Sequence, residues 1–219
     1  MWYDEKNRSA EEIHMLIIGI CGASGSGKST LAEELVNKIN RPAVLINQDA
    51  YYRDHAYLPF EERAKINYDE PGVFEHNELL YDMKQLASGN RITKKSYDYT
   101  HHCRADATDE YIEPSDVVII EGIHTFYDER LRDLMDFKIY IKVDPDICLL
   151  RRVKRDINKR GREINGIYEQ YLSTVKPMYE KYIKNYIDYA DLIVAGGGKN
   201  AKISDILAFY INAGQVKDQ

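Results

Sequence analysis

The chain has 219 residues, with 30 lysines and arginines against 36 aspartates and glutamates, which gives a formal net charge of −6. Because this balance provides no global positive field for a nucleic-acid backbone, we expect no binding of DNA or RNA. No apolar run approaches the roughly 18 residues of a membrane span, and the charged start lacks the apolar core of a signal peptide, so a cytoplasmic protein without membrane contact is expected. The three cysteines form no C-x-x-C pair, so neither a disulfide framework nor a zinc site is indicated.

Short apolar runs that resemble β-strands recur along the chain and are separated mostly by helical patterns. Strands that alternate with helices predict an α/β fold, in which a parallel sheet is covered by helices on both faces. The length fits a single domain at residues 15–213, after an N-terminal extension at 1–14 and before a C-terminal tail at 214–219. The expected strands are 16–21, 43–47, 116–120, 137–143 and 191–195.

The clearest motif follows the first expected strand and reads GASGSGKST at residues 22–30. It fits the pattern G-x-x-x-x-G-K-[ST], with a strand before it and a helical pattern behind it, as a phosphate-binding loop requires. The glycines let successive N–H groups point inward at phosphate oxygens, and the N-terminus of the helix adds partial positive charge. Lys28 is expected to neutralise the β- and γ-phosphates and Ser29 to reach Mg²⁺; a glycine-rich turn without a ligand is the structural alternative. The predicted nucleotide contacts are Gly22, Ala23, Ser24, Gly25, Ser26, Gly27, Lys28, Ser29 and Thr30.

Two acidic residues follow the second and third expected strands. Asp49 comes after 43–47 and Glu121 after 116–120, so both are expected at the sheet edge where the phosphate loop lies. Glu121 could reach a metal directly or through water, unless it is a solvated acid at the end of a strand. Asp49 could accept the proton of an attacking hydroxyl or hold Mg²⁺, and its position in the sequence does not separate these roles from that of a turn residue or helix cap.

The segment RRVKRDINKRGR at residues 151–162 holds seven basic residues in twelve positions. Like charges that are stacked on one helical face repel, so we expect an anion such as a triphosphate to compensate them, the alternative being a solvated face. Gly161 would let the segment act as a hinged lid at about 152–170, whose arginines could stabilise a phosphoryl group in transfer. The spacing i, i+3, i+7, i+10 predicts one face for Arg152, Arg155, Lys159 and Arg162.

Residues 48–114 interrupt the alternation of strands and helices, and the polar alternation within residues 91–114 suits a β-hairpin or a small excursion from the sheet. An insertion of this length inside a compact domain is usually functional. Its aromatic and imidazole side chains suit a flat heterocycle, and Asp69 could bind a diol through two hydroxyls. Because neighbouring residues of an extended segment point to opposite faces, only one of two adjacent histidines can line a pocket. The side chains concerned are Tyr97, Tyr99, His101 and His102.

With these pieces in order, the chain resembles the uridine kinases (uridine-cytidine kinases) of the P-loop kinase group, from about residue 15 to about residue 206. The resemblance implies a three-layer P-loop kinase fold with an acceptor-site hairpin and a helical lid. It also implies a magnesium-dependent enzyme of pyrimidine salvage that phosphorylates the 5′-hydroxyl of uridine and cytidine with ATP or GTP, and it suggests a homotetramer. The matching segments are GASGSGKST, QDAYY, NYDEPGVF, YDYTHHCR, EGIHTFY, RRVKRDINKRGR, QYLSTVKPM and ADLIV.

Residue by residue, the resemblance implies that Asp49 is the base that faces the nucleoside hydroxyl, and that Ser29 and Glu121 help to hold Mg²⁺. It implies that Asp69 and Arg152 hold the ribose hydroxyls. The remaining matches are Tyr97 and His102 for the pyrimidine edge, Tyr52 and Tyr68 for packing around the nucleoside, Arg155, Arg160 and Arg162 for the phosphates, and Gln170 for a further acceptor contact.

The sequence departs from the family pattern at four places. Tyr68 stands where Phe is frequent, His101 precedes His102, and Cys103 replaces a usual Ser. The pair Ala195–Gly196 stands where Pro-Arg is typical, near the adenine end of the donor site, so the choice between ATP and GTP stays open. Two alternatives also stay open: a related kinase that acts on phosphoribulose, pantothenate or glycerate, and a nucleotide-switched binding module without acceptor chemistry.

Overall fold

The computed structural model describes residues 15–106 and 109–214, so the expected extension at 1–14 and nearly all of the expected tail lie outside the described residues. Five strands form a sheet in the order β2-β7-β1-β8-β9, and every neighbouring pair is parallel. The predicted parallel α/β sheet is therefore confirmed, with strand ends within one residue of those expected. The strands are β1 (Leu16–Gly22), β2 (Ala43–Asn47), β7 (Val117–Glu121), β8 (Phe137–Lys142) and β9 (Leu192–Ala195).

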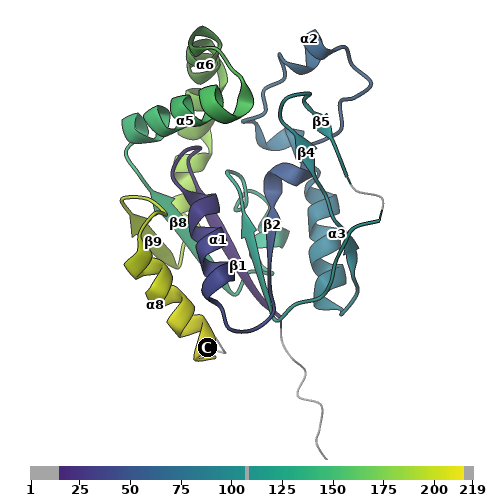
Figure 1. Ribbon diagram of the computed structural model, residues 1–219, viewed down its shortest axis with the longest axis vertical. Helices are drawn as coiled ribbons and strands as arrows, with labels where there is room; N and C mark the ends of the chain where they lie inside the picture. The colour runs from purple at the N-terminus through teal and green to yellow at the C-terminus, as the bar shows by residue number, and fades with distance from the viewer. Residues whose placement is uncertain (1–14, 107–108, 215–219) are drawn as a thin grey trace, which may run out of the picture.

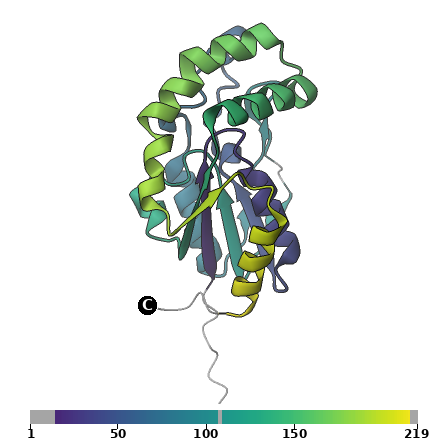
Figure 2. The ribbon, with the colours of Figure 1, turned by 90° about the vertical axis from the view of Figure 1, so that its left-hand side faces the viewer.

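Helices cover both faces of the sheet, which gives three layers (Figures 1 and 2). The side chains of β1 alternate, so that Leu16, Ile18 and Ile20 pack with α1 (Lys28–Lys38) and α8 (Ala201–Asn212). Ile17 and Cys21 belong to the opposite core. Because β1 is buried on both faces, its sequence is a continuous apolar run. The opposite core is closed by α3 (His76–Ala87), α4 (Glu129–Arg132) and the 3-10 helix η4 (Ile183–Tyr189).

The segment between β2 and β7 stands beside the carboxyl ends of the strands (Figure 1). It contains the predicted hairpin, built as two short antiparallel pairs, β3 with β6 and β4 with β5. Its elements, besides α3, are η1 (Gln48–Tyr51), α2 (Phe60–Arg63), η2 (Pro71–Val73), β3 (Ile92–Thr93), β4 (Tyr97–Asp98), β5 (Cys103–Arg104) and β6 (Tyr111–Ile112).

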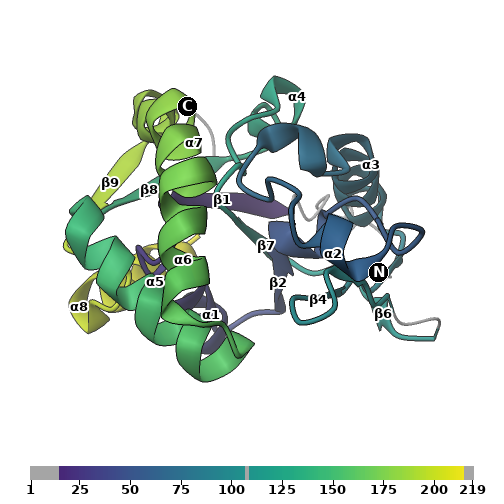
Figure 3. The same ribbon diagram turned by 90° about the horizontal axis from the view of Figure 1, so that it is seen from above.

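On the other side of the same sheet edge lie α5 (Pro145–Arg160) and α6 (Ile164–Gln170), opposite α2 and β4 (Figure 3). Gly161 ends α5 in the left-handed conformation, with φ 62°. The prediction of one helical face is therefore wrong for Arg162, which lies beyond the helix, while Arg152, Arg155 and Lys159 lie within α5 at the expected spacing. After α6 the chain continues through the π-helical turn η3 (Tyr171–Val175) and α7 (Lys176–Lys181).

In residues 15–106 and 109–214, no helix combines the length and the apolar composition that crossing a membrane requires.

Candidate active site

The phosphate loop joins β1 to α1 through three glycines in conformations that other residues rarely adopt. Gly22, Gly25 and Gly27 have φ angles of 147°, 86° and 96°, and the Ser26 N–H closes a turn on the Ala23 carbonyl at 3.1 Å. The first turn of α1 contains no acidic residue, so its N-terminus keeps its positive partial charge. This arrangement is the anion cradle that the motif predicts.

Lys28 opens α1 and is almost completely buried beside this cradle. Its Nζ atom donates to the Ala23 carbonyl oxygen at 3.1 Å, which holds the ammonium group over the loop. An ammonium in this place contributes a compact positive charge to a phosphate bound by the loop.

Asp49 and Glu121 meet at the sheet edge that their strands predict, because Asn47 at the end of β2 is in register with Glu121 on β7. The Asn47 side chain caps η1 by accepting from the Asp49 N–H at 2.9 Å. Glu121 is buried and accepts from the Ser29 hydroxyl at 2.8 Å. Burial raises the pKa of Glu121, with the Lys28 ammonium acting in the opposite direction.

The oxygen atoms of Ser29, Asp49 and Glu121 fit Mg²⁺, a hard cation that usually binds one or two carboxylates together with substrate phosphates. Within the parts of the chain that the structure describes, no three His, Cys, Asp or Glu side chains gather in a way that could hold a metal ion by themselves.

A cavity of about 180 Å³ joins the phosphate loop to the hairpin and the lid. Every residue predicted from the sequence as catalytic, metal-binding or acceptor-binding lines it. Of the predicted nucleotide contacts, Ser24, Lys28 and Ser29 reach it. The lining residues are Ser24, Lys28, Ser29, Asn47, Asp49, Tyr52, Tyr68, Asp69, Tyr97, Tyr99, His102, Glu121, Ile123, Arg152, Arg155, Arg160, Arg162 and Gln170.

Aromatic rings form the wall of this cavity on the hairpin side. Tyr52 packs against Phe74 at 4.4 Å and against Tyr97 at 4.8 Å between ring centroids. Tyr68 stacks on His102 at 5.1 Å with an interplanar angle of 22°. Flat aromatic surfaces of this kind suit a planar heterocycle.

His102, and not His101, lines the cavity, so the prediction that only one of the two could do so is confirmed. The two side chains point apart because they lie in a turn, and not in the extended strand that was expected, since His102 adopts a positive φ of 51°. His101 is exposed, with its ring against the Asp98 carboxylate at 2.7 Å. Burial, together with Arg162, lowers the pKa of His102 to about 4, so its ring is neutral at pH 7 and can both donate and accept.

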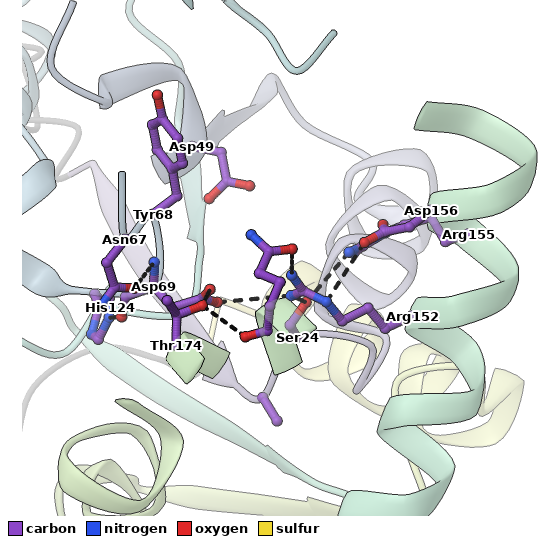
Figure 4. Close-up of polar contacts among 12 residues, drawn as sticks. Ser24, Asp49, Asn67, Tyr68, Asp69, His124, Arg152, Arg155, Asp156 and Thr174 are labelled. Atoms are coloured by element: carbon purple, nitrogen blue, oxygen red, sulfur yellow. Dashed lines mark hydrogen bonds and ion pairs between the residues drawn. The ribbon is translucent and has the colours of Figure 1, made fainter. Parts of the chain in front are cut away.

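Asp69 is buried at the acceptor side and held at every polar atom (Figure 4). Its N–H donates to the Asn67 side chain at 3.1 Å, and its carbonyl lies 2.7 Å from His124 Nε2. The Thr174 hydroxyl donates to Oδ2 at 3.2 Å, and Arg152 Nη1 lies 3.7 Å from Oδ1. Burial raises the pKa of Asp69 and Arg152 opposes that change.

His124 and Thr174 were not expected at this site. Thr174 reaches Asp69 from η3, where the wider π-helical turn carries no local sequence signal. His124 is fully buried three residues after Glu121. The only signal in the sequence was a polar residue just after the end of an apolar strand.

Asp156 lies inside α5 and pairs with four arginines of the expected lid. Its carboxylate is fully buried, with Arg155 Nε at 2.9 Å and Arg160 Nη1 at 3.5 Å from Oδ1. Arg152 Nε and Arg162 Nη1 each lie 3.6 Å from Oδ2. Burial alone would raise the pKa of Asp156, but the guanidinium groups outweigh it and hold the pKa below its usual value. The protein itself therefore supplies one anion that compensates the basic segment, which the sequence interpretation missed.

The lid arginines also connect the phosphate loop to the acceptor side. Arg152 Nη1 and Arg155 Nη2 donate to the Ser24 hydroxyl at 3.1 and 3.4 Å, and Figure 4 shows Arg152 reaching toward both Ser24 and Asp69. Gln170 Oε1 accepts from Arg152 Nη2 at 2.9 Å and from Arg162 Nη1 at 2.7 Å. Arg152 thus contacts both Ser24 of the phosphate loop and Asp69 on the other side of the cavity.

The glycines that follow β9 pack against the phosphate loop. Gly198 N donates to the Ser26 carbonyl at 3.2 Å, and a Cβ atom on Gly27 would lie 2.9 Å from Gly198 N. A Cβ atom on Gly197 would lie 2.7 Å from Arg151 Nη1. This close approach explains the small residues at Gly197 and Gly198, whereas a Cβ atom on Gly196 would meet nothing within 4 Å and the residue there has a positive φ of 80°.

The sequence was compared with known protein families and proteins, and the matches are kinases, as the phosphate loop suggests. The model of the phosphoribulokinase / uridine kinase family matches residues 17–202. The chain belongs to this family. It is 45% identical over 195 residues to a uridine kinase of Leuconostoc citreum, with 88% of this chain and 92% of the relative covered. It is also 45% identical over 198 residues to a uridine kinase of Clostridium botulinum, with 90% and 95% covered.

Among solved structures, a putative fructose transport system kinase from Silicibacter has the same fold. The TM-score is 0.64 at 21% identity, with 87% of this chain and 92% of that chain covered. This likeness confirms the predicted P-loop kinase architecture.

Proposed function

We propose that this kinase transfers the γ-phosphoryl group of ATP or GTP to the 5′-hydroxyl of uridine or cytidine in the presence of Mg²⁺. The observation that carries the proposal is the shared cavity, which is lined on one side by Lys28 and Ser29 and on the other by Tyr97 and His102, with Asp49 between them. The two relatives described above, which are named uridine kinases, support the choice of acceptor.

In this reaction the acceptor oxygen attacks the γ-phosphorus, the bond from that phosphorus to the β–γ bridging oxygen breaks, and the hydroxyl proton passes to Asp49. Lys28 neutralises the diphosphate that leaves. Arg155, Arg160 and Arg162 neutralise the phosphoryl group in transfer and exclude water from it. Mg²⁺, when bound by Ser29, Asp49 or Glu121, would add a divalent charge beside the phosphates.

On the acceptor side, the buried Asp69 and its neighbour Arg152 present a carboxylate and a guanidinium that can hold the two ribose hydroxyls. Tyr52 and Tyr68 pack around the nucleoside. The neutral His102 and the Tyr97 hydroxyl would then meet the polar edge of the pyrimidine, whose mixed donors and acceptors need partners of both kinds.

A panel of acceptors crossed with ATP and GTP, with and without Mg²⁺, tests the proposal through the nucleotide products. We expect UMP or CMP from the nucleosides, no turnover after chelation of Mg²⁺, and no turnover with phosphoribulose, pantothenate or glycerate. Product from one of those three acceptors alone would indicate a related kinase. Stoichiometric ATP binding without any product would indicate a binding module.

Asp49→Ala should bind ATP with near-normal affinity and lose phosphorylation by about 10²- to 10⁴-fold, because a positioned base contributes on that order. Isothermal titration and a coupled assay of ADP release measure the two quantities. Asp188→Ala, at an exposed position on η4, is the matched control and should behave like the wild type. Near-normal turnover of Asp49→Ala would remove Asp49 as the base.

A further inference from the structure

Tyr99 follows β4 directly and contacts both the proposed base and the lid. Its hydroxyl donates to Asp49 Oδ2 at 2.9 Å. The Arg160 guanidinium carbon lies 4.0 Å from the centroid of its ring. Its ring also meets Tyr97 edge to face at 5.5 Å. One side chain thus joins Asp49, the lid and the aromatic wall of the acceptor site.

The hydrogen bond from Tyr99 restricts the orientation of the Asp49 carboxylate. The phenol is the donor in this hydrogen bond, because a carboxylate oxygen can only accept. The Asp49 backbone is held independently by Asn47. With Oδ2 occupied by the phenol, Oδ1 is the oxygen left to face an acceptor hydroxyl or the metal.

The ring of Tyr99 connects this orientation to the lid. Arg160 lies over the ring and also pairs with Asp156 Oδ1 at 3.5 Å, so its guanidinium is shared between the hairpin and the carboxylate inside α5. In a cation–π contact of this kind the negative face of the ring attracts the guanidinium. A movement of Arg160 would therefore also change the position of Tyr99, whose hydroxyl bonds to Asp49.

We propose that Tyr99 is a positioning residue: its hydroxyl turns Asp49 so that Oδ1 faces the acceptor hydroxyl, and its ring couples that orientation to the seating of Arg160 on the phosphates. The proposal rests on the proposed function, because it assigns a partner to the base of that reaction.

Two substitutions separate the two contacts. Tyr99→Phe removes the hydrogen bond and keeps the ring under Arg160, so we expect kcat to fall about tenfold or more while the KM for uridine stays within about twofold. Tyr99→Leu removes the ring as well, so the KM for ATP should rise roughly three- to tenfold in addition. Tyr81→Phe, at an exposed tyrosine on α3, is the control and should keep wild-type constants.

Combining Tyr99→Phe with Asp49→Ala distinguishes a positioning role of Tyr99 from a general effect on the structure. If Tyr99 acts through Asp49, the double variant Asp49→Ala/Tyr99→Phe should be no slower than Asp49→Ala alone. A wild-type kcat for Tyr99→Phe, or a full additional loss in the double variant, would overturn the proposal. Melting temperatures within about 2 °C of the wild type show that Tyr99→Phe is folded, so the decision does not depend on Tyr99→Leu. Failure of the wild type on every nucleoside would count against the proposed function instead, and the comparison would be made with the acceptor that the panel identifies.

Discussion

At the scale of single residues, His124 shows how a buried group can serve the site without touching a substrate. Its Nδ1 lies 2.9 Å from the Tyr186 hydroxyl and its Nε2 lies 2.7 Å from the Asp69 carbonyl. A neutral imidazole satisfies both, because Nε2–H can donate to the carbonyl while Nδ1 accepts from the phenol. Burial lowers the pKa of His124 to about 4. The backbone of Asp69, which we propose to bind the ribose, is therefore held by an uncharged imidazole.

We predict that His124 makes folding stability depend on pH. Its pKa is about 4 in the folded protein and about 6.5 in the unfolded chain. As pH falls from about 6.5 to about 4, the unfolded chain takes up a proton that the folded protein does not, so stability is lost by up to about 3 kcal/mol. The Asp69 carbonyl resists this change in the pKa, whereas His76 and Lys28 reinforce it. Urea unfolding of the wild type and of His124→Gln between pH 8 and pH 5 should give a shallower dependence for the variant, and parallel curves would contradict the prediction.

At the scale of elements, α5 carries a buried carboxylate, Asp156, near its C-terminal end. The side chain of Asp156 lies between four guanidinium groups, and its carbonyl accepts the N–H groups of Gly161 and Arg162 that end the helix. The same residue thus fixes the direction of the lid arginines and the point where α5 stops. Ser24 and Gln170 add neutral oxygens to the same group of arginines.

Asp156→Asn should lower the free energy of unfolding by roughly 3 kcal/mol, because it leaves partly buried guanidinium groups without a shared anion. Added tripolyphosphate should raise the melting temperature more in this variant than in the wild type, since an anion at the phosphate loop would replace part of the lost charge. Asp146→Asn, at an exposed position on the same helix, is the control and should shift stability by no more than about 0.5 kcal/mol. An equal response of variant and wild type to tripolyphosphate would show that Asp156 does not compete with phosphates for these arginines.

The sequence predicts the elements whose determinants are local. A strand such as β7 is an apolar run, and a loop such as 22–30 carries its glycines at fixed spacing, so both could be placed to within a residue. The contacts of the site depend on pairs of residues that are far apart in the chain. Asp49 and Tyr99 are separated by 50 residues, and Asp69 and Thr174 by 105. The resemblance to a known family supplied most of the residues that line the cavity, but it supplied neither Asn47, Tyr99 and Ile123 nor the partners of the others. Asp156 was overlooked because it stands inside a run of basic residues and only the folded helix shows where its carboxylate points.

At the scale of the whole molecule, the phosphate loop is held between two distant parts of the chain. A Cβ atom on Gly25 would lie 2.4 Å from the Cys148 carbonyl on α5, and one on Gly27 would lie 2.9 Å from Gly198 N. The loop therefore takes its shape from the lid helix on one side and from the segment after β9 on the other. The donor site is a property of the assembled fold more than of the motif alone.

Gly25→Ala should weaken ATP binding at least tenfold and lower the melting temperature, because the new Cβ meets backbone atoms and φ at this position is 86°. Gly166→Ala, within α6, has nothing within 4 Å of the new Cβ and should leave ATP binding unchanged while stabilising the protein by up to about 1 kcal/mol. Calorimetric titration with ATP and thermal unfolding of both variants test the pair. Normal ATP affinity in Gly25→Ala would mean that the loop can move away from α5 without consequence.

The order of strands in the sheet also decides when the site can form during synthesis. In the sheet, β1 lies between β7 and β8, and β2 pairs with β7. Leu16 of β1 and Ala43 of β2 both pair with Val117, so neither strand can pair until β7 has been synthesised. Until then the nascent chain carries two apolar strands with unpaired edges, the kind of intermediate on which chaperones act. The loop gains its contact with Cys148 later still. A ribosome-bound chain that ends before α5 should therefore hold the complete phosphate-binding motif and be unable to retain a nucleotide.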